Sequence, residues 1–285
     1  MPGRRLTWLD VFTSTPLTGN GLAVVHDADG LDRSTMQRVA RETNLSETTF
    51  IQSATVEGAD YRNRIYTIVE EIRFAGHPSL GTAVALARER GESEASYVQE
   101  TAAGLQPVEV ELSGTRARAS MLQEPAQFGE PVEPGPVLGA LGLGPGDGHR
   151  DLPVQAVSTG IYHLMIPLRD DVALARARPN LARVQTISQS TETMVLYAFV
   201  PDGDDGGARA RGFFDAPDRV LEDPATGSAA GPLCAYMHRH AGAGSVRIEQ
   251  GVQLGRPSVL DTSIEGDRVR VVGECVIVLE GSLSV

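Results

Sequence analysis

Hydrophobic and polar residues alternate over several segments of the first half of the chain, with the two-residue period of a half-buried β-strand. Strands are therefore predicted at 6–13, 22–26, 47–53 and 61–69, and shorter ones near Tyr97, Val108 and Arg118. Apolar residues at helical spacing predict a helix at 34–43. A second helix is predicted from about 79 to 90, and because it is apolar almost all round, most of its surface should be buried.

The second half of the chain repeats this plan. Strands are predicted at 154–158, 162–167, 194–200 and 208–214, a helix from about 225 to 238, and closing strands near Val246, Val259 and Val269 and at 275–279. Between the halves, the segment 129–148 is dense in glycine and proline, which is typical of a connecting loop. We therefore expect two half-domains, 1–128 and 129–285, with a last strand that could return to the first half.

An internal repeat supports this division. The segment 77–83 (HPSLGTA) aligns without gaps on 223–229 (DPATGSA), and each segment leads into a predicted buried helix. Proline and small residues are a common way to start a helix, so the motif alone proves little. Because the two copies lie about half a chain length apart in similar surroundings, duplication is the better interpretation.

The repeated segments carry candidate chemistry. A helix N-terminus offers unpaired backbone N–H groups and the positive end of the helix dipole. Gly81 and Gly227 lack a Cβ, which would let a ligand approach the backbone, and Thr82 and Ser228 add hydroxyl donors. Two such helix starts facing each other across a cleft between the halves would hold a small carboxylate.

The same arrangement would place His77 and Asp223 on opposite sides of the bound acid, which is the geometry that proton transfer requires. Glu47, at the start of a predicted apolar strand, is a third candidate. On spacing alone, a solvated acid at a strand end is the simpler interpretation of Glu47. If its side chain turned into the cleft instead, desolvation would raise its pKa toward that of a general base.

Composition excludes several classes of function. The net charge is −12 and the 25 basic residues are scattered, so nucleic-acid binding is not expected. All 25 are arginine, and without lysine neither a Schiff base nor a P-loop is possible. No apolar run of 18 residues predicts a membrane span, and no signal peptide is recognised, so we expect a cytoplasmic protein. Two cysteines are too few for a disulfide framework.

Three other sites were weighed and are not predicted. The glycine-rich run at 142–148 fails the spacing of a dinucleotide-binding loop. Ser228 lies outside the spacing of a hydrolase nucleophile elbow. Cys234 and His238 share a helical face, but His240 is rotated away from it, so no metal site is expected.

Six ordered blocks of sequence resemble the PhzF family, the phenazine-biosynthesis branch of the diaminopimelate-epimerase fold. They comprise the segments 10–25, 44–48, 74–83, 158–160 and 222–229, and Gln250-Gly251 with the segment 255–258. The resemblance implies an α+β fold of two pseudo-symmetric halves, each a central helix wrapped by a mostly antiparallel sheet. It also implies a homodimer that works without a cofactor.

Relatives that racemise amino acids use two opposed cysteines, but here the corresponding loops carry Gly76-His77 and Asp223. The resemblance implies an isomerase with Glu47 as base and with His77 and Asp223 orienting a small carboxylated substrate, such as trans-2,3-dihydro-3-hydroxyanthranilate, in phenazine or other antibiotic biosynthesis. The backbone positions implied in substrate binding are Gly76, Gly81, Thr82, Gly227, Ser228 and Ala229. A non-catalytic ligand-binding or interaction protein, and an epimerase of another small acid, stay open.

Overall fold

The computed structural model describes residues 3–202 and 206–285, and the chain divides into two compact units. Unit 1 comprises Met1–Leu122 and Val272–Val285, and unit 2 comprises Gln123–Val271. The division thus falls a few residues before the boundary after residue 128 that the sequence analysis proposed, and the chain end belongs to the first unit. No helix among the described residues is long and apolar enough to cross a membrane.

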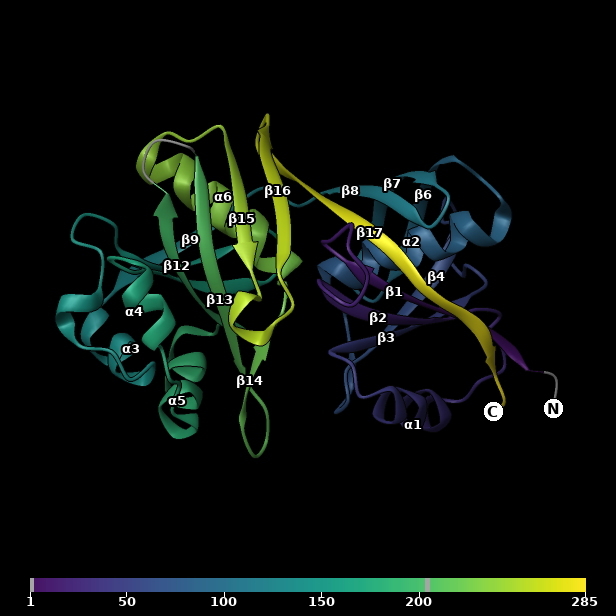
Figure 1. The fold of residues 1–285 in the computed structure, drawn as a ribbon, viewed down its shortest axis with the longest axis horizontal. Coiled ribbons are helices and arrows are strands. Elements are labelled where there is room, and N and C mark those ends of the chain that lie inside the picture. Colours follow the sequence, from purple (N-terminus) through teal and green to yellow (C-terminus); the bar gives the residue numbers. More distant parts are fainter. Residues whose placement is uncertain (1–2, 203–205) are drawn as a thin grey trace. The chain divides into compact units, whose positions relative to one another are not determined.

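Unit 1 is built around the helix α2 (Gly76–Arg90), which contacts most of the surrounding strands (Figure 1). In sheet order these are the C-terminal part of β17 (Arg268–Leu283), β1 (Arg4–Val11), β2 (Asn20–Val25), β3 (Glu47–Gln52), β4 (Tyr61–Tyr66), β6 (Glu94–Thr101), β7 (Gly104–Ser113) and β8 (Arg116–Leu122). Because β8 pairs in turn with β17, the strands enclose the helix. The helix α1 (Arg33–Thr43) connects the parallel strands β2 and β3, and the short β5 (Glu71–Ile72) pairs with β4.

Close packing explains the glycine inside α2. A Cβ at Gly81 would lie 2.6 Å from Leu22 Cδ2 and 3.0 Å from Val11 Cγ2, both on the strands beneath the helix. Only a residue without a side chain allows the helix and the sheet to approach this closely.

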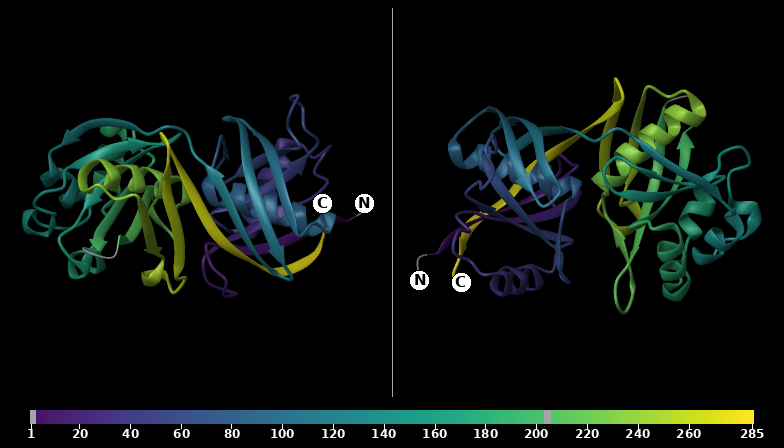
Figure 2. Two further views of the ribbon diagram at one scale, coloured as in Figure 1. Left: turned by 90° about the horizontal axis from the view of Figure 1, so that it is seen from above. Right: turned by 180° about the vertical axis from the view of Figure 1, so that it is seen from behind.

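Unit 2 has the same plan around the helix α6 (Gly227–Ala241). Its strands, in sheet order, are β9 (Gln127–Val132), β10 (Val154–Ser158), β11 (Tyr162–Pro167), β12 (Val195–Asp202), β13 (Gly207–Asp215), β15 (Ser245–Gln250) and β16 (Ser258–Glu265), and β14 (Val220–Asp223) pairs with β13. The parallel pairs β11–β12 and β13–β15 repeat the pairs β2–β3 and β4–β6 of unit 1. Figure 2 shows the strands around α2 and around α6 from two further sides.

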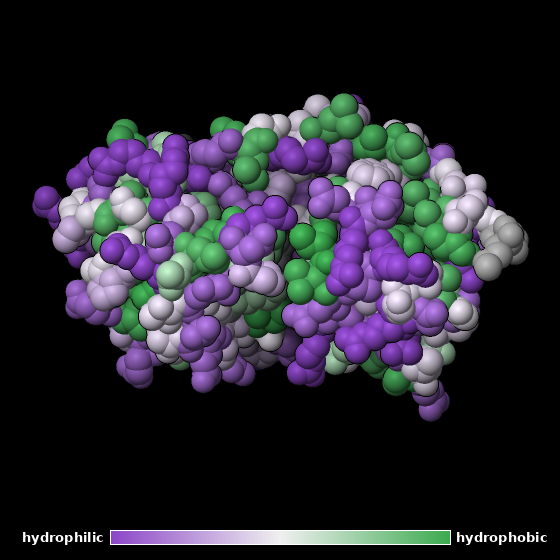
Figure 3. Space-filling view, turned by 90° about the horizontal axis from the view of Figure 1, so that it is seen from below, coloured by the Kyte–Doolittle hydropathy of each residue, from purple (hydrophilic) through white to green (hydrophobic). Residues whose placement is uncertain are grey.

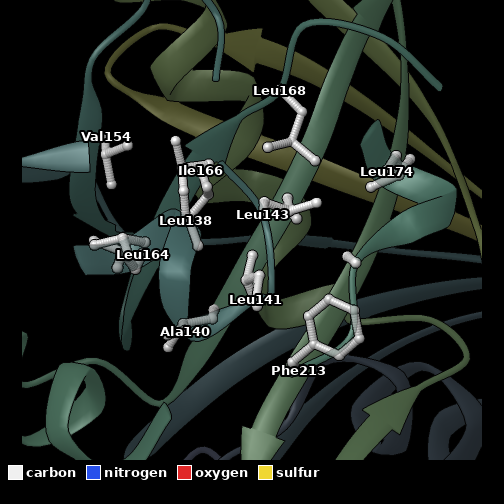
Figure 4. Close-up of a cluster of buried hydrophobic side chains, with 14 of the residues drawn as sticks. Leu138, Ala140, Leu141, Leu143, Val154, Leu164, Ile166, Leu168, Leu174 and Phe213 are labelled. Atoms are coloured by element: carbon white, nitrogen blue, oxygen red, sulfur yellow. The ribbon is translucent and has the colours of Figure 1, made fainter. Parts of the chain in front are cut away.

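The sheet of unit 2 buries both of its faces. On one face, an apolar cluster joins Leu164 and Ile166 of β11 to Leu138 and Leu141 of α3 (Pro134–Ala140) and to neighbouring side chains (Figure 4). The helices α4 (Asp171–Arg176) and α5 (Leu181–Thr191) also contribute to this layer. Residues that alternate with these along the strands face α6, as the ring of Phe199 does in packing against Tyr236.

The helices α3, α4 and α5 lie where the sequence analysis predicted no helix. α3 falls within the segment 129–148, which was predicted to be a loop, and it begins with Pro134 in its first turn. Two 3-10 turns, η1 (Pro145–Asp147) and η2 (Val252–Leu254), complete the elements. In the space-filling view of Figure 3, hydrophilic and hydrophobic residues are interspersed over the visible face.

Candidate functional site

Glu47 and His77 meet in unit 1. Glu47 is the first residue of β3, and His77 is the second residue of α2. His77 Nε2 lies 3.3 Å from Glu47 Oε2, and the two side chains are only 4% and 14% exposed. The sequence analysis left open whether Glu47 was a solvated acid, and the structure turns its carboxylate inward against a buried histidine.

The protonation state of His77 follows from its surroundings. Burial lowers its pKa to about 3, so the ring is neutral near pH 7. Asn20 Nδ2 lies 3.3 Å from His77 Nδ1, and an amide N–H there can only donate to an unprotonated ring nitrogen. The ring proton therefore sits on Nε2, the nitrogen that faces Glu47.

The start of α2 differs from the sequence analysis. The helix begins at Gly76, so His77 lies inside the first turn, where the N–H groups have no partner within the helix. The N-cap residue Ala75 supplies no side-chain cap. Gly81 instead packs against the sheet, and the Thr82 hydroxyl is bonded to Thr49 Oγ1 at 2.8 Å. This geometry contradicts the expectation that Gly81 and Thr82 present their backbone and hydroxyl to a ligand.

Asp223 lies in unit 2 at the end of β14, where it pairs with Gly212 of β13. Its carboxylate Oδ2 accepts a hydrogen bond of 2.8 Å from the Thr226 hydroxyl. A Cβ at Gly212 would lie 2.7 Å from that same hydroxyl oxygen, so this position has room only for glycine. Asp223 is therefore fixed by the turn that leads into α6.

Gln250 is the centre of this turn, and sequence reasoning noticed it only as part of the resemblance. Its Nε2 donates to the Asp223 carbonyl at 2.8 Å and to Thr226 Oγ1 at 3.0 Å. Its Oε1 accepts from the Thr226 N–H at 3.1 Å and from the Tyr197 hydroxyl at 2.8 Å. One buried amide thus satisfies four polar groups around Asp223.

The start of α6 also lacks a side-chain cap at its N-cap residue Thr226. Gly227 and Ser228 are the first two helical residues, so their N–H groups have no partner within the helix. The Ala229 N–H, in contrast, donates to the Thr226 carbonyl at 2.9 Å. The structure therefore favours Gly227 and Ser228 as anion-binding donors and contradicts the inclusion of Ala229.

The two units are not equivalent in their acidic groups. In the parallel pair β2–β3, Glu47 stands opposite Leu22, and in the corresponding pair β11–β12, Val195 stands opposite His163. Val195 thus occupies in unit 2 the strand position that Glu47 occupies in unit 1. A second carboxylate is absent from that position, so the repeat does not supply two matched bases.

The cysteines do not fit a thiolate role. Cys234 and Cys275 are fully buried, and burial raises both pKa values, that of Cys275 to about 12. His238 Nδ1 lies 2.9 Å from the Ala243 carbonyl, and His240 Nε2 lies 2.8 Å from Gln155 Oε1. Within residues 3–202 and 206–285, no three metal-binding side chains come together.

Known proteins resemble the chain over nearly its whole length. Residues 9–281 match the family model of the phenazine biosynthesis-like proteins, PhzC-PhzF. A trans-2,3-dihydro-3-hydroxyanthranilate isomerase from Pseudomonas aeruginosa is 36% identical over 274 residues, covering 94% of this chain and 92% of the relative.

Solved structures agree. A structure described as a predicted epimerase from Pseudomonas aeruginosa has a TM-score of 0.86 and 35% identity, with 99% of each chain covered. A PhzF-family phenazine biosynthesis protein from Bacillus anthracis has a TM-score of 0.85 and 27% identity, with 100% of each chain covered.

An α+β scaffold of two similar units with a buried carboxylate–histidine pair defines an isomerase of the epimerase-like fold. More narrowly, the chain belongs to the PhzF family of phenazine biosynthesis-like proteins. The resemblance and the fold class inferred from the sequence are thereby confirmed.

Proposed function

We propose that this isomerase moves a proton between two carbon atoms of a small cyclic carboxylic acid that carries an amino or hydroxyl group, without a cofactor. The contact between Glu47 and the neutral His77 carries the proposal. The named activity of the 36% identical relative supports trans-2,3-dihydro-3-hydroxyanthranilate as the first substrate to test.

Glu47 is proposed as the base. Its carboxylate takes a proton from an activated carbon, the electron pair moves along the adjacent double bond, and the resulting carboxylic acid returns the proton to another carbon on the same face. The presence of valine at the corresponding strand position of unit 2 supports one base rather than two. His77 donates from Nε2 and so stabilises negative charge near Glu47 as the proton moves.

Asp223 and the first turn of α6 are proposed to bind the substrate. A fixed carboxylate such as Asp223 would accept hydrogen bonds from an amino or hydroxyl group. The N–H groups of Gly227 and Ser228 would donate to the substrate carboxylate, helped by the positive end of the helix dipole.

The test is turnover of a panel of amino- and hydroxy-substituted cyclic acids in D₂O, followed by NMR. We expect an isomerised product from the wild-type protein and a loss of at least about a hundredfold in kcat for Glu47→Gln. Glu42→Gln, which changes an exposed acid of α1, is the matched control and should retain activity. Calorimetric binding of these acids without any turnover would contradict the proposal and favour a binding protein.

A further inference from the structure

Two residues in the first part of α6 are unusual for a helix. Pro232 lies inside it and has no N–H, so it cannot donate to the carbonyl of Ser228, four residues earlier. Gly231, just before it, costs helix stability relative to alanine. Both residues become understandable from the polar side chains packed against this turn.

Gln123 approaches the helix at Gly231. Its Nε2 donates to the Gly227 carbonyl at 3.0 Å, and its Oε1 accepts from the Thr159 hydroxyl at 2.5 Å. A Cβ at Gly231 would lie only 1.9 Å from Gln123 Oε1 and 2.9 Å from Thr159 Oγ1. Gly231 therefore leaves the space that the two side chains occupy.

His163 approaches from the strand β11. It is fully buried, and it alternates with Leu164 and Ile166, whose side chains belong to the apolar cluster on the opposite face of the sheet. Neither ring nitrogen makes a hydrogen bond of full geometry. Burial lowers the pKa of His163 to about 3, and the backbone of Ser228 opposes this, as only a carbonyl facing the ring would.

We propose that Gln123, Thr159 and His163 form a polar clamp that positions the first turn of α6 to receive the substrate carboxylate. The clamp holds the two carbonyls of Gly227 and Ser228, one by Gln123 and the other by His163 in place of the N–H that Pro232 lacks. Because a peptide unit is planar, fixing the Gly227 carbonyl also fixes the Ser228 N–H. The role in substrate binding rests on the proposed function, whereas the clamp itself does not.

A double-mutant cycle of His163→Leu and Pro232→Ala tests the clamp. Pro232→Ala restores an N–H for the Ser228 carbonyl, so the histidine should then become dispensable. In the wild-type background, we expect His163→Leu to raise KM about tenfold with kcat within about twofold, because carboxylate binding is weakened equally in ground and transition states. In the Pro232→Ala background, the same substitution should change KM less than about twofold.

His26→Leu is the matched control, since His26 is equally buried but lies on β2 of unit 1, bonded to Thr7 and Glu89. It should lower the melting temperature without raising KM. If His163→Leu leaves KM unchanged, or raises it equally in both backgrounds, the positioning role is overturned.

A failure of the proposed function is distinguishable from a failure of the clamp. If no panel acid is turned over, the cycle is measured by urea unfolding instead. The clamp then predicts that His163→Leu destabilises the wild-type protein at least about fivefold more, in its unfolding equilibrium, than it destabilises Pro232→Ala. Equal destabilisation in both backgrounds would overturn the clamp itself.

Discussion

Replacing Gln250 by methionine removes the hub of the network around Asp223 while nearly conserving side-chain shape. Gln250 is 1% exposed, and four hydrogen bonds of 2.8 to 3.1 Å depend on it. Its loss leaves the Tyr197 hydroxyl, the Thr226 N–H and the Asp223 carbonyl without these bonds. At about 1–3 kcal/mol for each stranded polar group, and with partial relaxation, we expect a loss of about 3–5 kcal/mol in the free energy of unfolding.

Urea unfolding followed by circular dichroism measures this loss by linear extrapolation. Tyr197→Phe is the matched control, because it removes only the 2.8 Å bond from the Tyr197 hydroxyl and should cost about 1 kcal/mol. We also expect kcat to fall in Gln250→Met, since Asp223 is no longer fixed. A loss below about 1 kcal/mol, or one no larger than that of Tyr197→Phe, would refute the reasoning.

Three further predictions follow from the geometry. Asn20→Leu removes the donor to His77 Nδ1 and should lower kcat about tenfold with little change in KM, measured by steady-state kinetics; unchanged kcat would contradict the tautomer assignment. Gly81→Ala places a Cβ 2.6 Å from Leu22 and should cost about 1–3 kcal/mol of stability by urea unfolding, while kcat and KM of the folded protein stay near wild type; a selective rise in KM would restore Gly81 to the binding site. His163 has its pKa lowered from 6.5 to about 3, so the unfolded chain binds its proton first and stability present above pH 6.5 is lost as pH falls toward 3. Comparing unfolding at pH 7 and pH 5, His163→Leu should remove about 2 kcal/mol of this acid loss; an identical loss in both proteins would contradict the burial of a neutral ring.

The sequence predicts most of the strands and both central helices because their apolar patterns are strong and local. It also brings out the repeat at 77–83 and 223–229, since that signal lies in the order of residues. The helices α3, α4 and α5 are missed because they are short and their stability comes from the shared apolar cluster rather than from a long periodic pattern.

The contacts of the candidate site depend on residues far apart in the chain. Glu47 and His77 could be singled out from the sequence, but the 3.3 Å distance between them follows from the packing of α2 beside β3. Gln250 and His163 carry no local motif, and only strand pairing brings them near α6. For His163, Pro232 was the available signal, because a proline inside a helix leaves a carbonyl for another donor.

The most direct test of the central claim is deuterium transfer by Glu47. Trans-2,3-dihydro-3-hydroxyanthranilate labelled with deuterium at the carbon that loses its proton is converted in H₂O under single-turnover conditions, and the product is examined by NMR. A single base that takes and returns the same proton predicts measurable deuterium at the new carbon, and Glu47→Gln should form no product. Product free of deuterium at every early time point, or turnover that persists in Glu47→Gln, would contradict the account.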